Sequence, residues 1–179
     1  IEVRAGYIAL FTCSAHFIMR RPLDDIMWIE LVDIAPYEPP WPEIDTQRQL
    51  VRATDHDGNV AIAAYRDTMG CTVLPPHWTE ADVVRLPYVA FPPRPDVAAL
   101  RFPKGDKANP KMNRRQRALM DQAFDGTSFG EKTVTLGTVI IKAGKIVAEQ
   151  YRPGFGVHTG YRTWSTAKSI AATLIGIAS

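Results

Sequence analysis

Ser165 and Lys168 are the residues of this sequence whose types and spacing suit covalent catalysis. In a helix, side chains three positions apart lie on the same face, so the serine hydroxyl and the lysine amine are expected to be neighbours. A serine hydroxyl is a weak nucleophile and needs a base, which a lysine can supply where burial disfavours its charge. A helix N-terminus also stabilises negative charge that develops there. The pair therefore predicts a nucleophilic serine with a lysine base.

The residues around the pair predict where it lies in the fold. Residues 156–160 contain two glycines and lead into the motif, and the run from Ile170 to Ala178 is apolar and rich in alanine. This run predicts a helix that begins near Ser165 and is buried, because apolar side chains occupy nearly all of its faces. The motif alone leaves a second interpretation open, in which the serine is a helix N-cap and the lysine lies at the surface.

Two further elements are expected before the motif. Residues 113–124 predict a helix ended by Gly126, and its arginines are expected on a solvated face of that helix. Residues 136–142 and 145–151 predict two strands joined by a tight turn at Ala143-Gly144. The order helix, hairpin, serine motif is therefore expected along the last third of the chain.

This order, together with the segment Trp-Ser-Thr-Ala-Lys-Ser, resembles the beginning of the serine β-lactamase and penicillin-binding-protein superfamily. The similarity covers about residues 113–179 and is greatest to the class C-like branch, with its esterases, D-amino-acid peptidases and amidases, and 6-aminohexanoate-dimer hydrolases. Residues 139–151 resemble the family's first two strands, and residues 162–169 resemble its first catalytic motif. Residues 65–72 resemble, more weakly, the leading extension of some bacterial members.

The resemblance implies a serine hydrolase that cleaves amide or ester bonds of a small linear substrate through an acyl-enzyme. Ser165 would be the nucleophile, with its backbone N–H as half of an oxyanion hole, and Lys168 would be the base. The family's tyrosine motif and Lys/His-x-Gly strand follow the serine in the family's order, whereas all six tyrosines here precede Ser165. We expect the remaining C-terminal part of the same fold, in the same polypeptide or as a separate chain, to complete the site.

The resemblance also divides the chain in two. Residues 111–179 are expected to form the first part of a β-lactamase-like domain, an antiparallel sheet flanked by helices, within an α+β or α/β fold. Residues 1–110 are expected to form an extension with proline-rich segments. In it, residues 1–19 predict a buried strand, residues 21–31 a helix, and residues 47–74 a hairpin.

A second class of function stays open, in which the fold is retained for binding without catalysis. In that case Ser165 and Lys168 are ordinary residues at the start of a helix, and the proline-rich N-terminal extension docks a partner. The two classes differ in whether the serine reacts covalently.

Cys13 and Cys71 are both expected in strands, where they either pair in a disulfide or remain two buried free thiols. A disulfide would imply an oxidising compartment, and a periplasmic or secreted location is expected in preference to the cytoplasm. Cys13-x-x-His16 has the spacing of a zinc-ligand pair, but Cys71 and His77 do not. No metal and no cofactor are therefore expected.

The composition excludes several other classes of function. The net charge is +2, too balanced to predict binding to nucleic acid, and no apolar run approaches the roughly 18 residues of a membrane span. Asp55 and Asp57 have the spacing that begins a calcium loop. Val60 and Arg66 stand where that loop needs glycine and glutamate, so residues 55–59 predict a hairpin turn.

Overall fold

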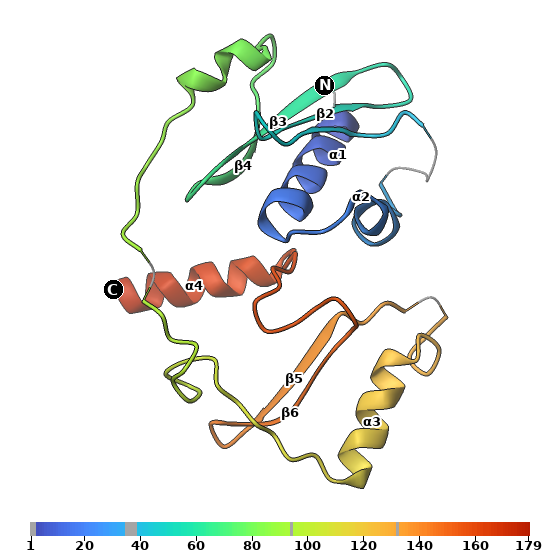
Figure 1. Cartoon of the computed structure of the whole chain (residues 1–179), viewed down its shortest axis with the longest axis vertical. Helices are drawn as coiled ribbons and strands as arrows, with labels where there is room; N and C mark the ends of the chain where they lie inside the picture. Colours follow the sequence, from blue (N-terminus) through green and yellow to red (C-terminus); the bar gives the residue numbers. More distant parts are fainter. Residues whose placement is uncertain (1–2, 35–38, 94, 132) are drawn as a thin grey trace.

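The computed structural model describes residues 3–34, 39–93, 95–131 and 133–179. Within these residues, a four-stranded antiparallel sheet packs against N-terminal helices, and a two-stranded hairpin and two further helices follow along the chain (Figure 1). The fold is therefore of the mixed α and β class, as the sequence predicts. In the same described part of the chain, none of the helices is both long enough and apolar enough to cross a membrane.

Residues 3–18 are helical where the sequence pattern predicts a strand, so that prediction is wrong. Helix α1 (Val3–Cys13) continues into a π-helical turn, η1 (Ser14–Ile18). The residues of α1 that are buried share one face of the helix; they are Ala5, Ile8, Ala9, Thr12 and Cys13. Their spacing of three, one, three and one residues is helical, and it outweighs the weak alternation that suggests a strand.

The sheet consists of β1 (Glu43–Asp45), β2 (Leu50–Thr54), β3 (Val60–Arg66) and β4 (Gly70–Val73), hydrogen-bonded in that order. The strands β2 and β3 form the predicted hairpin, with Leu50 opposite Ala64 and Thr54 opposite Val60. Helix α1 covers one face of these two strands (Figure 1). The hairpin is therefore confirmed, and β1 and β4 extend it on both sides.

The turn between β2 and β3 is shaped by the Asp55 carboxylate. Its Oδ1 atom accepts hydrogen bonds from the backbone N–H groups of Asp57 and Asn59, each at 3.0 Å. The Asn59 side chain also donates to this carboxylate and, more than any other contact, holds the pKa of Asp55 below its ordinary value. The aspartates thus build a turn, as the sequence predicts.

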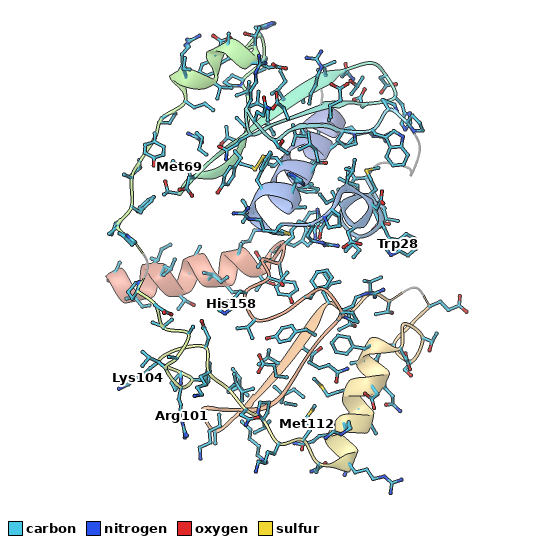
Figure 2. All side chains as sticks on the ribbon, in the orientation of Figure 1. Trp28, Met69, Arg101, Lys104, Met112 and His158 are labelled. Atoms are coloured by element: carbon cyan, nitrogen blue, oxygen red, sulfur yellow. A yellow bond between two sulfur atoms is a disulfide. The ribbon has the colours of Figure 1, made fainter. Side chains whose placement is uncertain are left out.

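A second short helical segment closes the N-terminal core. Helix α2 (Leu23–Asp25) continues as the π-helical turn η2 (Ile26–Glu30), which confirms the predicted helix. Ile26 and Met27 are buried against the sheet and α1, whereas Trp28 lies on the opposite, exposed side (Figure 2). Glu30 ends this segment on its buried side.

Cys13 and Cys71 form a disulfide with their Cα atoms 6.1 Å apart, which decides between the two alternatives of the sequence. The bond joins the end of α1 to β4, so Cys13 lies in a helix and the predicted strand around it is absent from the described residues. Both sulfurs are oxidised and cannot act as thiolate ligands for zinc. Among the described residues, no group of three or more His, Cys, Asp and Glu side chains is placed to hold a metal ion.

Removal of this disulfide is expected to destabilise the protein by about 4 kcal/mol, because the cysteines are 58 residues apart and closing such a loop restricts the unfolded chain. The measurement is urea unfolding of the Cys13→Ser/Cys71→Ser variant beside the oxidised protein. Dithiothreitol should shift the midpoint of the parent protein and leave that of the double variant unchanged. Equal midpoints for the oxidised parent and the double variant would contradict the prediction.

Loop residues after the sheet lead to the second half of the chain. The 3-10 helix η3 (Glu80–Arg85) begins with a capping box between Thr79 and Asp82. Helix α3 (Arg114–Phe124) begins with another, in which Asn113 Oδ1 accepts from the Gln116 backbone at 2.9 Å. This N-cap is the local signal that makes the helix predictable from the sequence, and the prediction is confirmed.

The hairpin before the serine motif is also confirmed. Strands β5 (Gly137–Lys142) and β6 (Lys145–Tyr151) pair in antiparallel register around Ala143 and Gly144. Both turn residues have positive φ, +48° and +70°, as a two-residue turn with the twist of a hairpin requires. Helix α4 (Thr166–Ala178) then follows the loop that carries Ser165.

Candidate active site

The structure brings together the two residues that the sequence singles out. The Lys168 Nζ atom lies 3.0 Å from the Ser165 Oγ atom, within hydrogen-bond distance. Ser165 is the N-cap residue of α4, but its side chain makes no capping hydrogen bond to the backbone of the helix. The hydroxyl is therefore directed to the lysine. As in the alternative interpretation, Ser165 lies at the N-cap and Lys168 is exposed, but the serine side chain contacts the lysine and makes no bond to the helix backbone.

Helix α4 is exposed along its whole length, so the prediction of a buried helix is wrong for the described chain. Ile170 is 50 % exposed and Leu174 60 % exposed, and the apolar residues after them are more exposed still. Apolar composition shows what a helix gains from burial, but not whether a covering surface is present. Lys168 is exposed for the same reason.

Trp164, directly before the serine, has a left-handed backbone with φ of +44°. This conformation is strained for a bulky residue and costs about 1–3 kcal/mol, so neighbouring contacts must maintain it. The next residues close the first turn of α4, with the Ala167 N–H donating to the Trp164 carbonyl at 3.1 Å and the Lys168 N–H to the Ser165 carbonyl at 3.0 Å. Ser165 thus lies between Trp164, with its left-handed backbone, and the first residue of helix α4.

Arg162, three residues before the serine, links this loop to the N-terminal half of the chain. Its Nη2 atom donates to the Glu30 carboxylate at 2.8 Å and to the Glu30 backbone carbonyl at 3.0 Å. Its guanidinium also lies over two aromatic rings, 4.2 Å from the centroid of Phe11 and 4.6 Å from that of Trp164. Arg162 therefore connects η2 and α1 to the residue that precedes the serine.

Glu30 is the centre of a buried charge cluster. Its carboxylate is 6 % exposed and receives Arg162 on one oxygen and Arg21, at 2.9 Å, on the other. Burial lowers the pKa of the Arg162 guanidinium, and the Glu30 charge opposes that effect. Arg21 in turn stacks over the Phe155 ring of the loop after β6, at 4.7 Å. Two arginines from different parts of the chain thus share one carboxylate.

The sequence indicates this cluster only faintly. Glu30 is the one charged residue in the segment Ile-Met-Trp-Ile-Glu-Leu, which would place it near the buried side of a short helix. A charge at such a position is rare unless it is paired, so the pattern predicts a partner without naming it. The partner Arg162 is 132 residues away in the sequence.

Replacing Glu30 with glutamine is expected to destabilise the protein by about 3–5 kcal/mol, because two arginines, one of them buried, would lose their shared counter-charge. Chemical denaturation monitored by circular dichroism measures the effect. Glu131→Gln, which removes a carboxylate from an exposed loop, is the matched control and should leave the midpoint unchanged. An unfolding free energy for Glu30→Gln within about 0.5 kcal/mol of the parent would contradict the prediction.

A small cavity of about 290 Å³ lies beside the motif, between the two halves of the chain. Leu10, Phe11 and Met19 line it from the N-terminal helices, and Tyr161 and Trp164 line it from the motif loop. Burial raises the pKa of the Tyr161 hydroxyl. The paired side chains of Glu30 and Arg162 also line it, so the cavity combines apolar walls with one ion pair.

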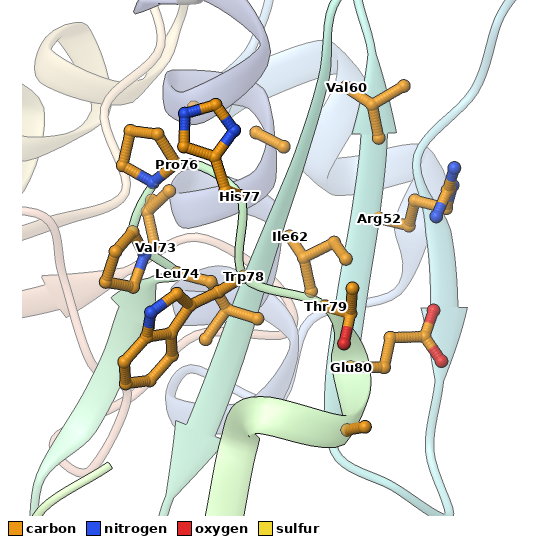
Figure 3. A pocket seen from close by; sticks show the side chains of 14 residues that line it. Arg52, Val60, Ile62, Val73, Leu74, Pro76, His77, Trp78, Thr79 and Glu80 are labelled. Carbon is orange, nitrogen blue, oxygen red and sulfur yellow. The ribbon is translucent and has the colours of Figure 1, made fainter. Parts of the chain in front are cut away.

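A cavity of about 760 Å³ lies over the face of the sheet in the N-terminal half, and its lining contains neither Ser165 nor Lys168 (Figure 3). Ile62 and Trp78 form part of an apolar surface there, and Arg52 and Glu80 lie at its edge (Figure 3). Glu80 is paired with Arg48 at 2.7 Å. This open groove is a candidate for binding, with no nucleophile in its lining.

No protein-family model matches the sequence, and no curated protein or solved structure matches it either. The chemistry of the site must accordingly be argued from its own geometry. That geometry is a serine hydroxyl and a lysine amine in contact, at the start of a helix and after a strained residue.

Proposed function

We propose that the protein is a serine hydrolase that cleaves amide or ester bonds of a small linear substrate through an acyl-enzyme on Ser165. The observation that carries the proposal is the 3.0 Å contact between the Ser165 hydroxyl and the Lys168 amine. A hydroxyl used only as a cap would bond to the backbone of the helix, whereas this one makes no capping bond. The resemblance of the motif to the β-lactamase and penicillin-binding-protein superfamily supports the same chemistry.

In the proposed reaction, Lys168 in its neutral form accepts the proton of the Ser165 hydroxyl while the oxygen attacks the substrate carbonyl carbon. The carbonyl oxygen becomes negative, and the Ser165 backbone N–H at the start of α4 stabilises it as half of an oxyanion hole. The lysine ammonium then donates its proton to the departing amine or alkoxide as the bond to carbon breaks. Water hydrolyses the resulting ester by the reverse use of the same two groups.

The proposal includes a partner for α4. Lys168 must lose its proton to act as a base, and the exposed helix gives it no low-dielectric surroundings. The apolar side chains Ile170, Leu174 and Ile177 are all at least half exposed. We propose that the C-terminal part of the same fold, in the same polypeptide or as a separate chain, covers this helix and supplies the tyrosine and the second oxyanion donor.

The proposal extends to the location of the protein. The disulfide between Cys13 and Cys71 supports a periplasmic or secreted protein, because cytosolic thiols are kept reduced. The mechanism itself uses a serine and a lysine and requires no cofactor.

A second candidate function rests on the groove over the sheet. An apolar lining with Trp78 and a charged edge is typical of a binding surface, and the groove belongs to the N-terminal extension rather than to the serine motif. In this alternative the protein is a non-catalytic relative of the superfamily whose extension docks a partner.

The two candidates are separated by covalent labelling of the complete protein. We expect a fluorophosphonate, and more slowly a penicillin-type β-lactam, to add to Ser165, as located by mass spectrometry of tryptic peptides. An adduct on any other serine, or no adduct at all, would contradict the hydrolase and favour the binding protein.

A further inference from the structure

We propose that Arg162 is a positioning residue for Ser165, and that through it the N-terminal extension controls the reactivity of the serine. Arg162 holds Trp164 in its left-handed conformation, and this conformation directs the next side chain, Ser165, towards Lys168. The proposal rests on the proposed function of Ser165. It adds that residues 1–110 are part of the catalytic unit rather than a separate module.

The first step concerns what restrains Trp164. Its side chain is 62 % exposed, so burial does not supply the free energy that its φ of +44° costs. Its ring contacts the Arg162 guanidinium, at 4.6 Å from the ring centroid, and Phe11 in a T-shaped arrangement, at 5.6 Å between centroids. These stacking contacts are therefore what opposes relaxation of the backbone to an ordinary conformation.

The second step concerns what restrains Arg162. One face of its guanidinium is shared with Phe11 of α1, and its Nη2 atom is bonded twice to Glu30. Among the described residues, its Nε and Nη1 atoms are buried and have no hydrogen-bond acceptor, so the Glu30 bonds and the two ring contacts are what hold the group. A planar, charged group with several donors satisfies all these contacts at once, which a lysine ammonium cannot do.

The third step connects this stack to the nucleophile. Ser165 follows Trp164 directly, and the N–H of Ala167 closes the turn on the Trp164 carbonyl at 3.1 Å. Rotation at Trp164 would move that carbonyl and the Ser165 side chain together, and would change the 3.0 Å distance between Ser165 Oγ and Lys168 Nζ. A displacement of about 1 Å in a reacting group can lower a rate roughly 100-fold.

The test uses Arg162→Gln, Arg162→Lys and Trp164→Phe in the complete protein, with Arg115→Gln on the exposed face of α3 as the charge-matched control. Two measurements are made: the rate constant for fluorophosphonate labelling of Ser165, and amide hydrogen exchange of residues 163–168. In Arg162→Gln we expect Ser165 to be labelled roughly 100-fold more slowly than in the parent protein, and the amide hydrogens of residues 163–168 to exchange faster. Arg162→Lys should recover little of the parent labelling rate. Trp164→Phe keeps an aromatic ring in the stack and should label at nearly the parent rate.

Because Arg162→Gln also disturbs the Glu30 cluster, Trp164→Ala provides a second variant that removes the stack and leaves the ion pairs intact. It should show the same slow labelling. Parent-like labelling in both Arg162→Gln and Trp164→Ala would overturn the inference while leaving the hydrolase proposal standing. A parent protein that is not labelled would overturn the hydrolase proposal. In that case, if amide hydrogen exchange at residues 163–168 were the same in Arg162→Gln as in the parent, the positioning role of Arg162 would also be overturned.

Discussion

Replacing Ser165 with alanine is expected to abolish acyl-enzyme formation and to lower kcat/KM for amide or ester substrates by roughly 10⁴–10⁶-fold. The reason is chemical, because the Ser165 Oγ atom is the group that forms the new bond to the substrate carbonyl, and a methyl group cannot replace it. Hydrolysis of a p-nitrophenyl ester and of a p-nitroanilide measures turnover, and intact-protein mass measures the acyl-enzyme. The fold should be unaffected, since Ser165 is exposed and its side chain bonds only to Lys168 among the contacts of the described residues.

The matched control is Ser179→Ala, at the other end of the same helix. Ser179 is also exposed, and its hydroxyl donates to the Gly176 carbonyl rather than to a lysine. The control variant should react with a fluorophosphonate at the rate of the parent protein. A Ser165→Ala protein that keeps the parent kcat/KM would show that another residue performs the chemistry.

The elements that the sequence predicts correctly are those with local signals. A capping box formed by Asn113 and Gln116 marks the start of helix α3, and the Ala143-Gly144 turn marks the hairpin of β5 and β6. The spacing of Ser165 and Lys168 brings them together for the same reason, because one turn of a helix is sufficient to define their distance. In each case the interacting residues are at most a few positions apart.

The first helix shows how a local signal can be misjudged. Its buried residues repeat with helical spacing from Ala5 to Cys13, but a weak alternation and a content of Ile, Ala and Phe suggest a strand. Helix α1 packs against β2 and β3, a long-range contact that no local pattern of the sequence predicts. The helical spacing of the apolar residues was therefore a better indicator than the weak alternation and the composition.

The residues that organise the site are those that the sequence does not predict. Glu30 and Arg162 meet across 132 positions, and the stack of Phe11, Arg162 and Trp164 depends on the same long-range approach. Such pairs follow from the packing of whole elements rather than from any spacing along the chain. The exposure of α4 has a similar origin, because the apolar pattern of a helix carries no information about its partner.

Replacing Lys168 with alanine is expected to lower the rate of Ser165 acylation by about 10²–10⁴-fold, the usual contribution of a general base. Lys168→Arg should be no better, because a guanidinium keeps its proton at the pH of the reaction and cannot accept the proton of the serine. Stopped-flow or mass-spectrometric measurement of fluorophosphonate labelling gives the rate constants. Lys168 is exposed, so neither substitution should change the unfolding free energy by more than about 0.5 kcal/mol.

Chemical rescue distinguishes a base from a residue that only holds the hydroxyl in place. In Lys168→Ala, small primary amines should restore part of the labelling rate in proportion to their concentration, because a neutral amine can take the place of the Nζ atom 3.0 Å from Ser165 Oγ. The same amines should not accelerate Ser165→Ala, which has no proton to transfer. A Lys168→Arg protein that labels at the parent rate would show that the cation, and not a base, is what the serine requires.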